Sequence, residues 1–257
     1  MNTEVITNIE EAFEELGVTP STLNNNQKKA LDEQGYIILP GIIDRTWLEQ
    51  LRQAFEQASQ RARDEAGMHT RPETGTRHVS LIINEKPALE RILTQPQVLA
   101  AAYQVLQRDF QVQQFGGRDP LPGYGQQGLH ADWLPRQQGQ PFSAVNSLWL
   151  LDDFTVESGA TRLVAGTHLL TTKPSKNMMQ PGSTHPNQLQ AIASAGSVLV
   201  FNAHLWHSGM QNRSKNHRRV INCFFLGREL RLFAGLPTSD LTGLSPAARY
   251  LVGDNPA

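Results

Sequence analysis

A histidine and an aspartate with the spacing of a metal-binding pair lie near the middle of the chain. His130 and Asp132 are separated by a single alanine. On an extended strand, residues i and i+2 project from the same face, so these two side chains can share one ion. An imidazole and a carboxylate are two of the three ligands of the facial triad that binds iron(II). The spacing alone is weak evidence, and a third ligand must come from another segment.

Two histidines, His204 and His207, offer that third ligand. On a helix their spacing would place them on one face, but residues 196–201 immediately before them have a strand pattern. If the strand continued, the two imidazoles would point to opposite sides. At most one of them is therefore expected to bind the metal, and the spacing does not say which.

Residues 123–128 match Gly-x-Gly-x-x-Gly, the fingerprint of dinucleotide binding. That motif works only between a strand and a helix whose amino terminus meets the pyrophosphate. Here prolines at positions 120, 122 and 135 flank it. We therefore expect these glycines to shape a turn and bind no nicotinamide or flavin.

Helical patterns dominate the first part of the chain. Residues 46–66 repeat apolar side chains at helical spacing, with Asp44 placed to cap the start, and residues 96–106 begin with a proline in the first turn. Two runs rich in β-branched residues, 36–40 and 78–83, predict strands. We interpret residues 1–109 as a mainly helical lead-in.

From residue 110 onward, short strand-like runs alternate with turns. The clearest runs are residues 145–151, 161–164, 197–201 and 220–226, with a long loop over 172–188 and a closing helix over 238–251. Helices in one stretch and strands in another predict an α+β protein that is mainly β, a sandwich or barrel with a helical lead-in. We interpret residues 1–257 as one domain, with a β core over 110–230 and an extension over 231–257.

The composition is that of a globular protein without a charged partner. Of 257 residues, 39% are hydrophobic and 18% charged, and the net charge is -1. This balance gives no case for nucleic acid or a membrane surface as partner. With a lone Cys223, an acidic amino terminus and no long apolar run, the expected location is the cytoplasm. A homodimer is compatible with the sequence.

A series of motifs resembles the phytanoyl-CoA dioxygenase family. In order, they are His-Ala-Asp at 130–132, Ser-Leu-Trp at 147–149, Glu-Ser-Gly-Ala-Thr-Arg at 157–162, Gly-Ser-Val-Leu-Val-Phe at 196–201, the segment 207–212, and Arg218. Residues 31–40 also resemble the opening helix and strand of the family. The resemblance covers most of the chain and implies a double-stranded β-helix, the jelly roll of cupin-like proteins.

The resemblance implies a set of iron ligands and cofactors. It makes His130, Asp132 and His207 the ligands of Fe(2+), with 2-oxoglutarate as cosubstrate and O2 as oxidant. It favours His207 over His204, because the histidine of the family is followed by small residues and then by an asparagine, as Asn212 stands here. Since related halogenases lack the carboxylate of Asp132, its presence favours hydroxylation, desaturation or ring formation.

The resemblance also implies cosubstrate-binding residues. Arg218 matches the arginine that binds the far carboxylate of 2-oxoglutarate, which a guanidinium grips through two parallel hydrogen bonds. Strand alternation alone leaves Arg218 and Arg219 both open. Gln127 resembles a glutamine aimed at the cosubstrate, and Trp149 and Thr161 are further candidates. For Trp149, core packing is the competing interpretation.

Gly209 departs from the family pattern, because some members have a serine here that helps to hold the cosubstrate.

The expected substrate is a small organic molecule. A secondary metabolite is favoured, because the sequence has no dense cluster of cations that could bind the phosphates of a CoA thioester. The alternatives are an acyl-CoA hydroxylase of the same family, a cupin-like iron dioxygenase without 2-oxoglutarate, and a metal-binding cupin-like protein without this chemistry.

Overall fold

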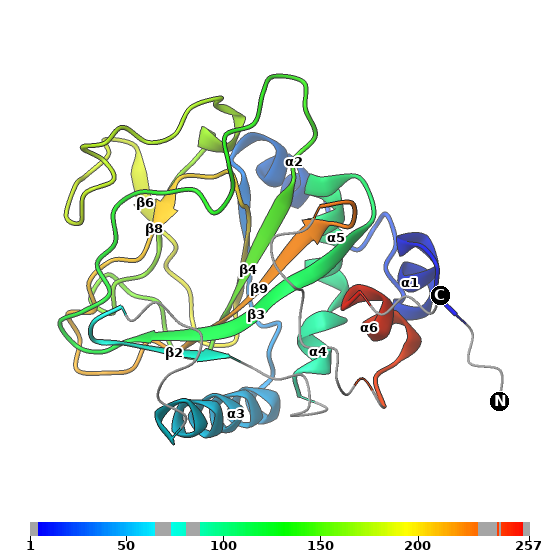
Figure 1. Ribbon diagram of the computed structural model, residues 1–257, viewed down its shortest axis with the longest axis horizontal. Coiled ribbons are helices and arrows are strands. Elements are labelled where there is room, and N and C mark those ends of the chain that lie inside the picture. The colour runs from blue at the N-terminus through cyan, green and yellow to red at the C-terminus, as the bar shows by residue number, and fades with distance from the viewer. Residues whose placement is uncertain (1–4, 65–72, 81–87, 231–240, 242, 254–257) are drawn as a thin grey trace.

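Two antiparallel sheets form the centre of the computed structural model, which describes residues 5–64, 73–80, 88–230, 241 and 243–253 (Figure 1). The strands of the larger sheet are β1 (Tyr36–Leu39), β2 (Thr76–Ser80), β3 (Phe110–Pro120), β4 (Ala144–Leu150), β7 (Val198–Asn202) and β9 (Val220–Gly227). Those of the smaller sheet are β5 (Arg162–Val164), β6 (Gln188–Gln190) and β8 (His207–Ser208). Their orders are β1-β7-β4-β9-β3-β2 and β6-β5-β8. Two facing antiparallel sheets with crossovers between them make the jelly roll that the resemblance implied.

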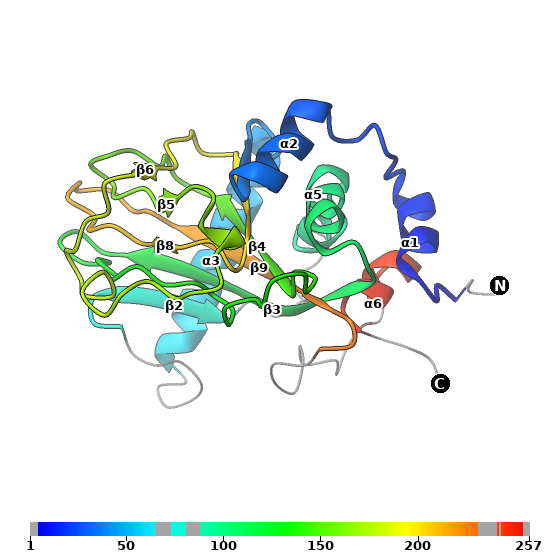
Figure 2. The ribbon, with the colours of Figure 1, turned by 90° about the horizontal axis from the view of Figure 1, so that it is seen from above.

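The helices cover the outer face of the larger sheet. They are α1 (Ile9–Leu16), α2 (Asn25–Glu33), α3 (Arg45–Asp64), α4 (Glu90–Leu93), α5 (Pro96–Leu106) and α6 (Pro246–Leu251), with a 3-10 turn at Thr167–Leu169. The smaller sheet lies on one side of β4, β9 and β3, and α4, α5 and α6 lie on the other (Figures 1 and 2). No helix in the described part of the chain is both long and apolar enough to cross a membrane.

Local sequence signals explain where the two best-predicted helices begin. Pro96 occupies the first turn of α5, whose bounds match the expected residues 96–106. At the start of α3, the Asp44 carboxylate accepts a hydrogen bond of 2.9 Å from the Trp47 backbone N–H. The apolar stripe of α3 then packs Trp47, Leu51 and Phe55 into the core, all fully buried.

The predicted strands at 36–40, 145–151, 161–164, 197–201 and 220–226 are confirmed to within about two residues at each end. The strand expected at 78–83 forms at Thr76–Ser80, and residues 81–83 lie outside the described part. The closing helix expected over 238–251 is shorter, Pro246–Leu251, because Ser245 caps its start and Pro246 fixes its first turn. Of the remaining expected residues, 238–240 and 242 lie outside the described part.

Side-chain alternation along β4 separates the core from the space between the sheets. Asn146 and Leu148 line a cavity between the two sheets. Trp149 points the other way, where its ring lies 5.7 Å from that of Trp47 in α3, and its Nε1–H donates to the Ser147 hydroxyl at 3.0 Å. The inner face of the larger sheet therefore supplies the wall of a cavity, and the outer face supplies the main core.

Candidate active site

Three side chains that could hold a metal ion meet in the lining of this cavity. The Nε2 atoms of His130 and His207 lie 3.8 Å and 3.4 Å from Asp132 Oδ1, and the ligand atoms of the three residues all lie within 4.8 Å of one another. His130 and His207 come together because their backbones pair, with N–H to O distances of 2.9 Å and 2.8 Å in the two directions. This bridge joins the segment around Asp132 to the edge of the smaller sheet at β8.

Backbone carbonyl groups fix the orientation of both imidazoles. Nδ1 of His130 lies 3.0 Å from the Gly128 oxygen, and Nδ1 of His207 lies 2.9 Å from the Leu205 oxygen. A carbonyl oxygen only accepts hydrogen bonds, so each Nδ1 must carry the hydrogen. The Nε2 atoms are then the basic ones, and they are the atoms that face Asp132 and the space between the three side chains.

One amide holds the carboxylate of Asp132. Asn146 Nδ2 donates a hydrogen bond of 2.9 Å to Asp132 Oδ2, which leaves Oδ1 toward the two histidines. Burial raises the pKa of Asp132, but the charge and hydrogen bond of His207, the charge of His130 and the Asn146 bond together lower it well below its ordinary value. Burial lowers the pKa of His130. Burial also acts to lower the pKa of His207, but the charge and hydrogen bond of Asp132 raise it above its ordinary value, as long as no metal ion takes the place of the proton. An ionised carboxylate and a neutral imidazole are the forms that bind a metal.

The donor set fits iron(II). Two imidazole nitrogens and one carboxylate oxygen within a single group are the facial triad of non-haem iron oxygenases. The cavity behind the triad has a volume of about 500 Å³, enough for a small organic molecule beside a cosubstrate.

Arg218 lies in the same cavity and has few partners of its own. Its side chain is 2% exposed, and of its five N–H donors one meets a described partner, the Met210 oxygen at 3.1 Å. Burial, followed by the nearby charge of Arg118, lowers the pKa of Arg218 to about 9. A buried guanidinium with spare donors is a site for a carboxylate.

Two carboxylates decide which of the neighbouring arginines faces inward. The backbone N–H of Arg218 donates to Asp119 at 2.9 Å, and that of Arg219 donates to Asp152 at 2.9 Å. Arg219 then turns outward and pairs with Asp152 and Glu56. Strand alternation left the choice between Arg218 and Arg219 open, and these contacts resolve it.

The other predicted cosubstrate residues divide between cavity and core. Gln127 lines the cavity, with its Oε1 accepting from the Gly209 N–H at 2.9 Å, and Thr161 lines it as well. Trp149 lies in the core against Trp47 and is not among the described residues that line the cavity. For Trp149 the structure thus places the side chain where the competing interpretation, core packing, expected it.

His204 is separated from the triad. Its Nε2 accepts a hydrogen bond of 3.3 Å from the Ser143 backbone, and its ring lies 5.6 Å from that of Phe142.

The turn predicted at the glycine-rich segment is confirmed, since Gly123 and Gly125 have φ angles of 90° and 92°, which a glycine adopts without strain.

Asn146 and Arg118 are two polar cavity residues that sequence reasoning missed. An amide within the apolar run of β4 was a usable signal for Asn146, because alternation puts it on the face opposite Trp149. Arg118 carried no comparable signal, since its approach to the cavity depends on how β3 pairs with β9.

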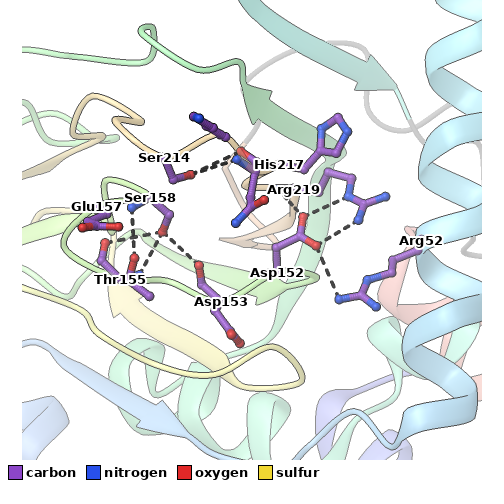
Figure 3. Close-up of a pocket in the computed structure, with 11 residues that line it drawn as sticks. Arg52, Asp152, Asp153, Thr155, Glu157, Ser158, Ser214, His217 and Arg219 are labelled. Atoms are coloured by element: carbon purple, nitrogen blue, oxygen red, sulfur yellow. Dashed lines mark hydrogen bonds and ion pairs between the residues drawn. The ribbon is translucent and has the colours of Figure 1, made fainter.

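A second hollow, on the outer face, is structural (Figure 3). It has a volume of about 560 Å³, and three of its charged groups pair with one another, since Asp152 accepts hydrogen bonds from Arg219 and Arg52. Thr155 and Ser158 exchange hydrogen bonds of 2.9 Å and 3.0 Å. These contacts hold the loop after β4 against the start of β9 and so support Arg218 from behind.

Comparisons with known proteins agree with this geometry. The family model described as Phytanoyl-CoA dioxygenase (PhyH) matches residues 31–220. Dioxygenase trt7 of Aspergillus terreus is 27% identical over 254 residues, which cover 92% of this chain and 86% of trt7. HygX from Streptomyces hygroscopicus, solved with nickel, 2-oxoglutarate and hygromycin B bound, superposes with a TM-score of 0.68 at 16% identity, over 87% of this chain and 96% of HygX. SnoK, a non-heme alpha ketoglutarate dependent carbocyclase from nogalamycin biosynthesis, superposes with a TM-score of 0.62 at 18% identity, over 82% of this chain and 87% of SnoK.

Proposed function

We propose that His130, Asp132 and His207 hold the iron of this chain, which belongs to the phytanoyl-CoA dioxygenase family and is an iron(II)- and 2-oxoglutarate-dependent dioxygenase. These three residues would supply three ligand atoms to the iron, a number that would leave room on it for 2-oxoglutarate and O2. Iron(II), 2-oxoglutarate and O2, when bound, supply the oxidation of a substrate C–H bond, with release of succinate and CO2.

The protein side chains supply binding and orientation. We propose that Arg218 holds the carboxylate of 2-oxoglutarate that is remote from the iron, because its spare donors face the cavity that the triad also lines. Gln127 and Thr161 line the same cavity and are proposed to contact the cosubstrate. This shared location of the triad and an uncompensated guanidinium is the observation that carries the proposal.

The proposed substrate is a small secondary metabolite. The wall beyond the triad carries the neutral amides of Gln114 and Asn222 beside the rings of Phe201 and Phe224. Such a wall suits an apolar skeleton that bears hydroxyl or carbonyl groups. An acyl-CoA would need a cluster of free cations for its phosphates. The two arginines of the described lining do not provide it, because Glu73 pairs with Arg118 and Arg218 is proposed to bind the cosubstrate. HygX was solved with hygromycin B bound and SnoK comes from nogalamycin biosynthesis, which supports the same class.

Anaerobic titration tests the cosubstrate claim. Wild-type protein with iron(II) should develop the weak visible charge-transfer band of a 2-oxo acid chelated to iron when 2-oxoglutarate is added. The variant R218L should lose most of its 2-oxoglutarate affinity, whereas R213L, which removes the same charge from an exposed position, should not. Absence of the band in the wild type would refute the proposed function.

The proposed setting is a cytoplasmic enzyme whose residues 1–257 act as one domain. Cys223 is fully buried and without a disulfide, which suits a reducing compartment. A single cooperative unfolding transition would support one domain, and two separated transitions would contradict it. The homodimer remains a prediction that light scattering can check.

A further inference from the structure

A second guanidinium, that of Arg118, reaches the cavity from β3. The Glu73 carboxylate holds it along one edge by accepting from both Nε and Nη2. Glu73 also pairs with His78 at 3.2 Å, so this carboxylate is itself held in place. The grip uses Nε and Nη2 of Arg118 and leaves Nη1 without a partner among the described residues. Arg118 lines the same cavity as the triad.

Gly209 marks the place that Arg118 occupies. A Cβ atom added at Gly209 would lie 2.9 Å from Arg118 Nη1, 2.9 Å from the Gly125 oxygen and 3.1 Å from Gln127 Oε1. This is the position where some members of the family have a serine that helps to hold the cosubstrate. Here no side chain fits, and the polar group that fills the space is the free end of Arg118.

Arg118 and Arg218 flank the same short segment. The Gly125 oxygen lies 3.4 Å from Arg118 Nη2, and a Cβ atom on Gly125 would lie 3.2 Å from Arg218 Nη2. Two guanidinium groups on either side of one glycine repel each other unless an anion lies between them. Glu73 balances Arg118, whereas the Asp119 contact of Arg218 is through the backbone N–H and leaves its guanidinium without an ion pair among the described residues.

We propose that Arg118 is a second cosubstrate-binding residue, which together with Arg218 grips the remote carboxylate of 2-oxoglutarate, and that Gly209 is required to admit it. This inference rests on the proposed function. Its consequence is specificity: a pair of guanidinium groups selects a dicarboxylic 2-oxo acid over a 2-oxo acid of the same chain length that ends in a methyl group.

The test compares two cosubstrates in the same spectroscopic assay. Dissociation constants for 2-oxoglutarate and 2-oxopentanoate are measured on the anaerobic iron(II) protein from the charge-transfer band. For R118L we expect the constant for 2-oxoglutarate to rise about tenfold, the size of one charge-assisted hydrogen bond, while that for 2-oxopentanoate stays within about twofold. R118K should restore part of the preference, and R213L should behave as the wild type.

A double variant adds an independent measure. G209A should weaken 2-oxoglutarate binding in the wild type by displacing Arg118, and should cost less in an R118A background, because the two changes act on one contact. Additive effects would show that Arg118 does not enter the site and would overturn the inference.

The outcomes separate this inference from the proposed function. A parallel rise of both constants in R118L would assign Arg118 a structural role, and unchanged constants would remove it from the site; either result overturns the inference alone. A wild type without the band would overturn the proposed function and this inference with it. If R118L is insoluble, R118K and R118Q replace it, and the quantity compared is the ratio of the dissociation constants for 2-oxopentanoate and 2-oxoglutarate. A wild-type ratio in R118Q overturns the inference.

Discussion

The contact between Asn146 and Asp132 gives a prediction that separates iron binding from folding. Asn146 Nδ2 donates the 2.9 Å hydrogen bond that holds Asp132 Oδ2, while Asn146 Oδ1 is buried without a partner among the described residues. N146L keeps the volume of the side chain, removes the donor and also removes the unpaired oxygen. Iron affinity should therefore fall much more than the stability of the metal-free protein.

The magnitude follows from the kind of bond. A hydrogen bond to a charged group contributes about 1.5–3 kcal/mol, and loss of a partner that orients a metal ligand typically weakens metal binding about 10–100-fold. In the metal-free protein, removal of the unpaired oxygen offsets part of the lost bond, so the unfolding free energy should change by about 1 kcal/mol or less.

Anaerobic competition against a coloured iron(II) chelator measures the affinity, and urea unfolding of the metal-free protein measures the stability. The matched control is N187L, because Asn187 is exposed and is not among the described residues that line the cavity. N146D should be worse than N146L, since it places a second carboxylate against the first. An iron affinity of N146L within about twofold of wild type would refute the reasoning, because no orienting bond would then have been lost.

Three further predictions follow from the same geometry. H207A should abolish iron-dependent succinate formation and the charge-transfer band, whereas H204A should keep much of both, because His204 hydrogen-bonds to the backbone away from the triad; the reverse result would assign the third ligand to His204. W149F should lower the unfolding free energy by about 1–2 kcal/mol, because one buried hydrogen bond and some packing are lost. The dissociation constant for 2-oxoglutarate should stay within about twofold of the wild-type value. A large rise in that dissociation constant, with the unfolding free energy unchanged, would instead place Trp149 in the cosubstrate site. The arginine partners of Glu56, first among them Arg77, lower its pKa from 4.5 to about 2. Because the pKa is lowered, the stability that Glu56 contributes is present above pH 4.5 and is lost as the pH falls toward 2. Between these pH values, the urea midpoint should therefore fall less steeply with pH in E56Q than in the wild type. Equal pH dependence of the two midpoints would contradict the stabilising role of the Glu56 ion pairs.

Local spacing determined the parts of this protein that depend on a few neighbouring residues. His130 and Asp132 lie two residues apart, which suffices to bring them into one group although the chain bends at Asp132 and does not continue as a strand. The helix at Pro96–Leu106 follows from its apolar period and its proline. The choice of His207 over His204 needed the family resemblance, since strand alternation allowed only one of them without naming it. These features are short-range, so the order of residues is sufficient to predict them.

Tertiary structure decided which side chains enter the cavity. Whether Arg218 or Arg219 turns inward depends on Asp119 and Asp152, which lie far away in sequence. The approach of Arg118 depends on the pairing of β3 with β9. Such contacts are fixed by strand register and by the loops between strands, and a shift of one residue would reverse every side chain on a strand. For that reason, the sequence and its family resemblance predicted the proposed iron ligands together with Arg218, Gln127 and Thr161, whereas the places of Asn146 and Arg118 in the cavity became visible only in the folded chain.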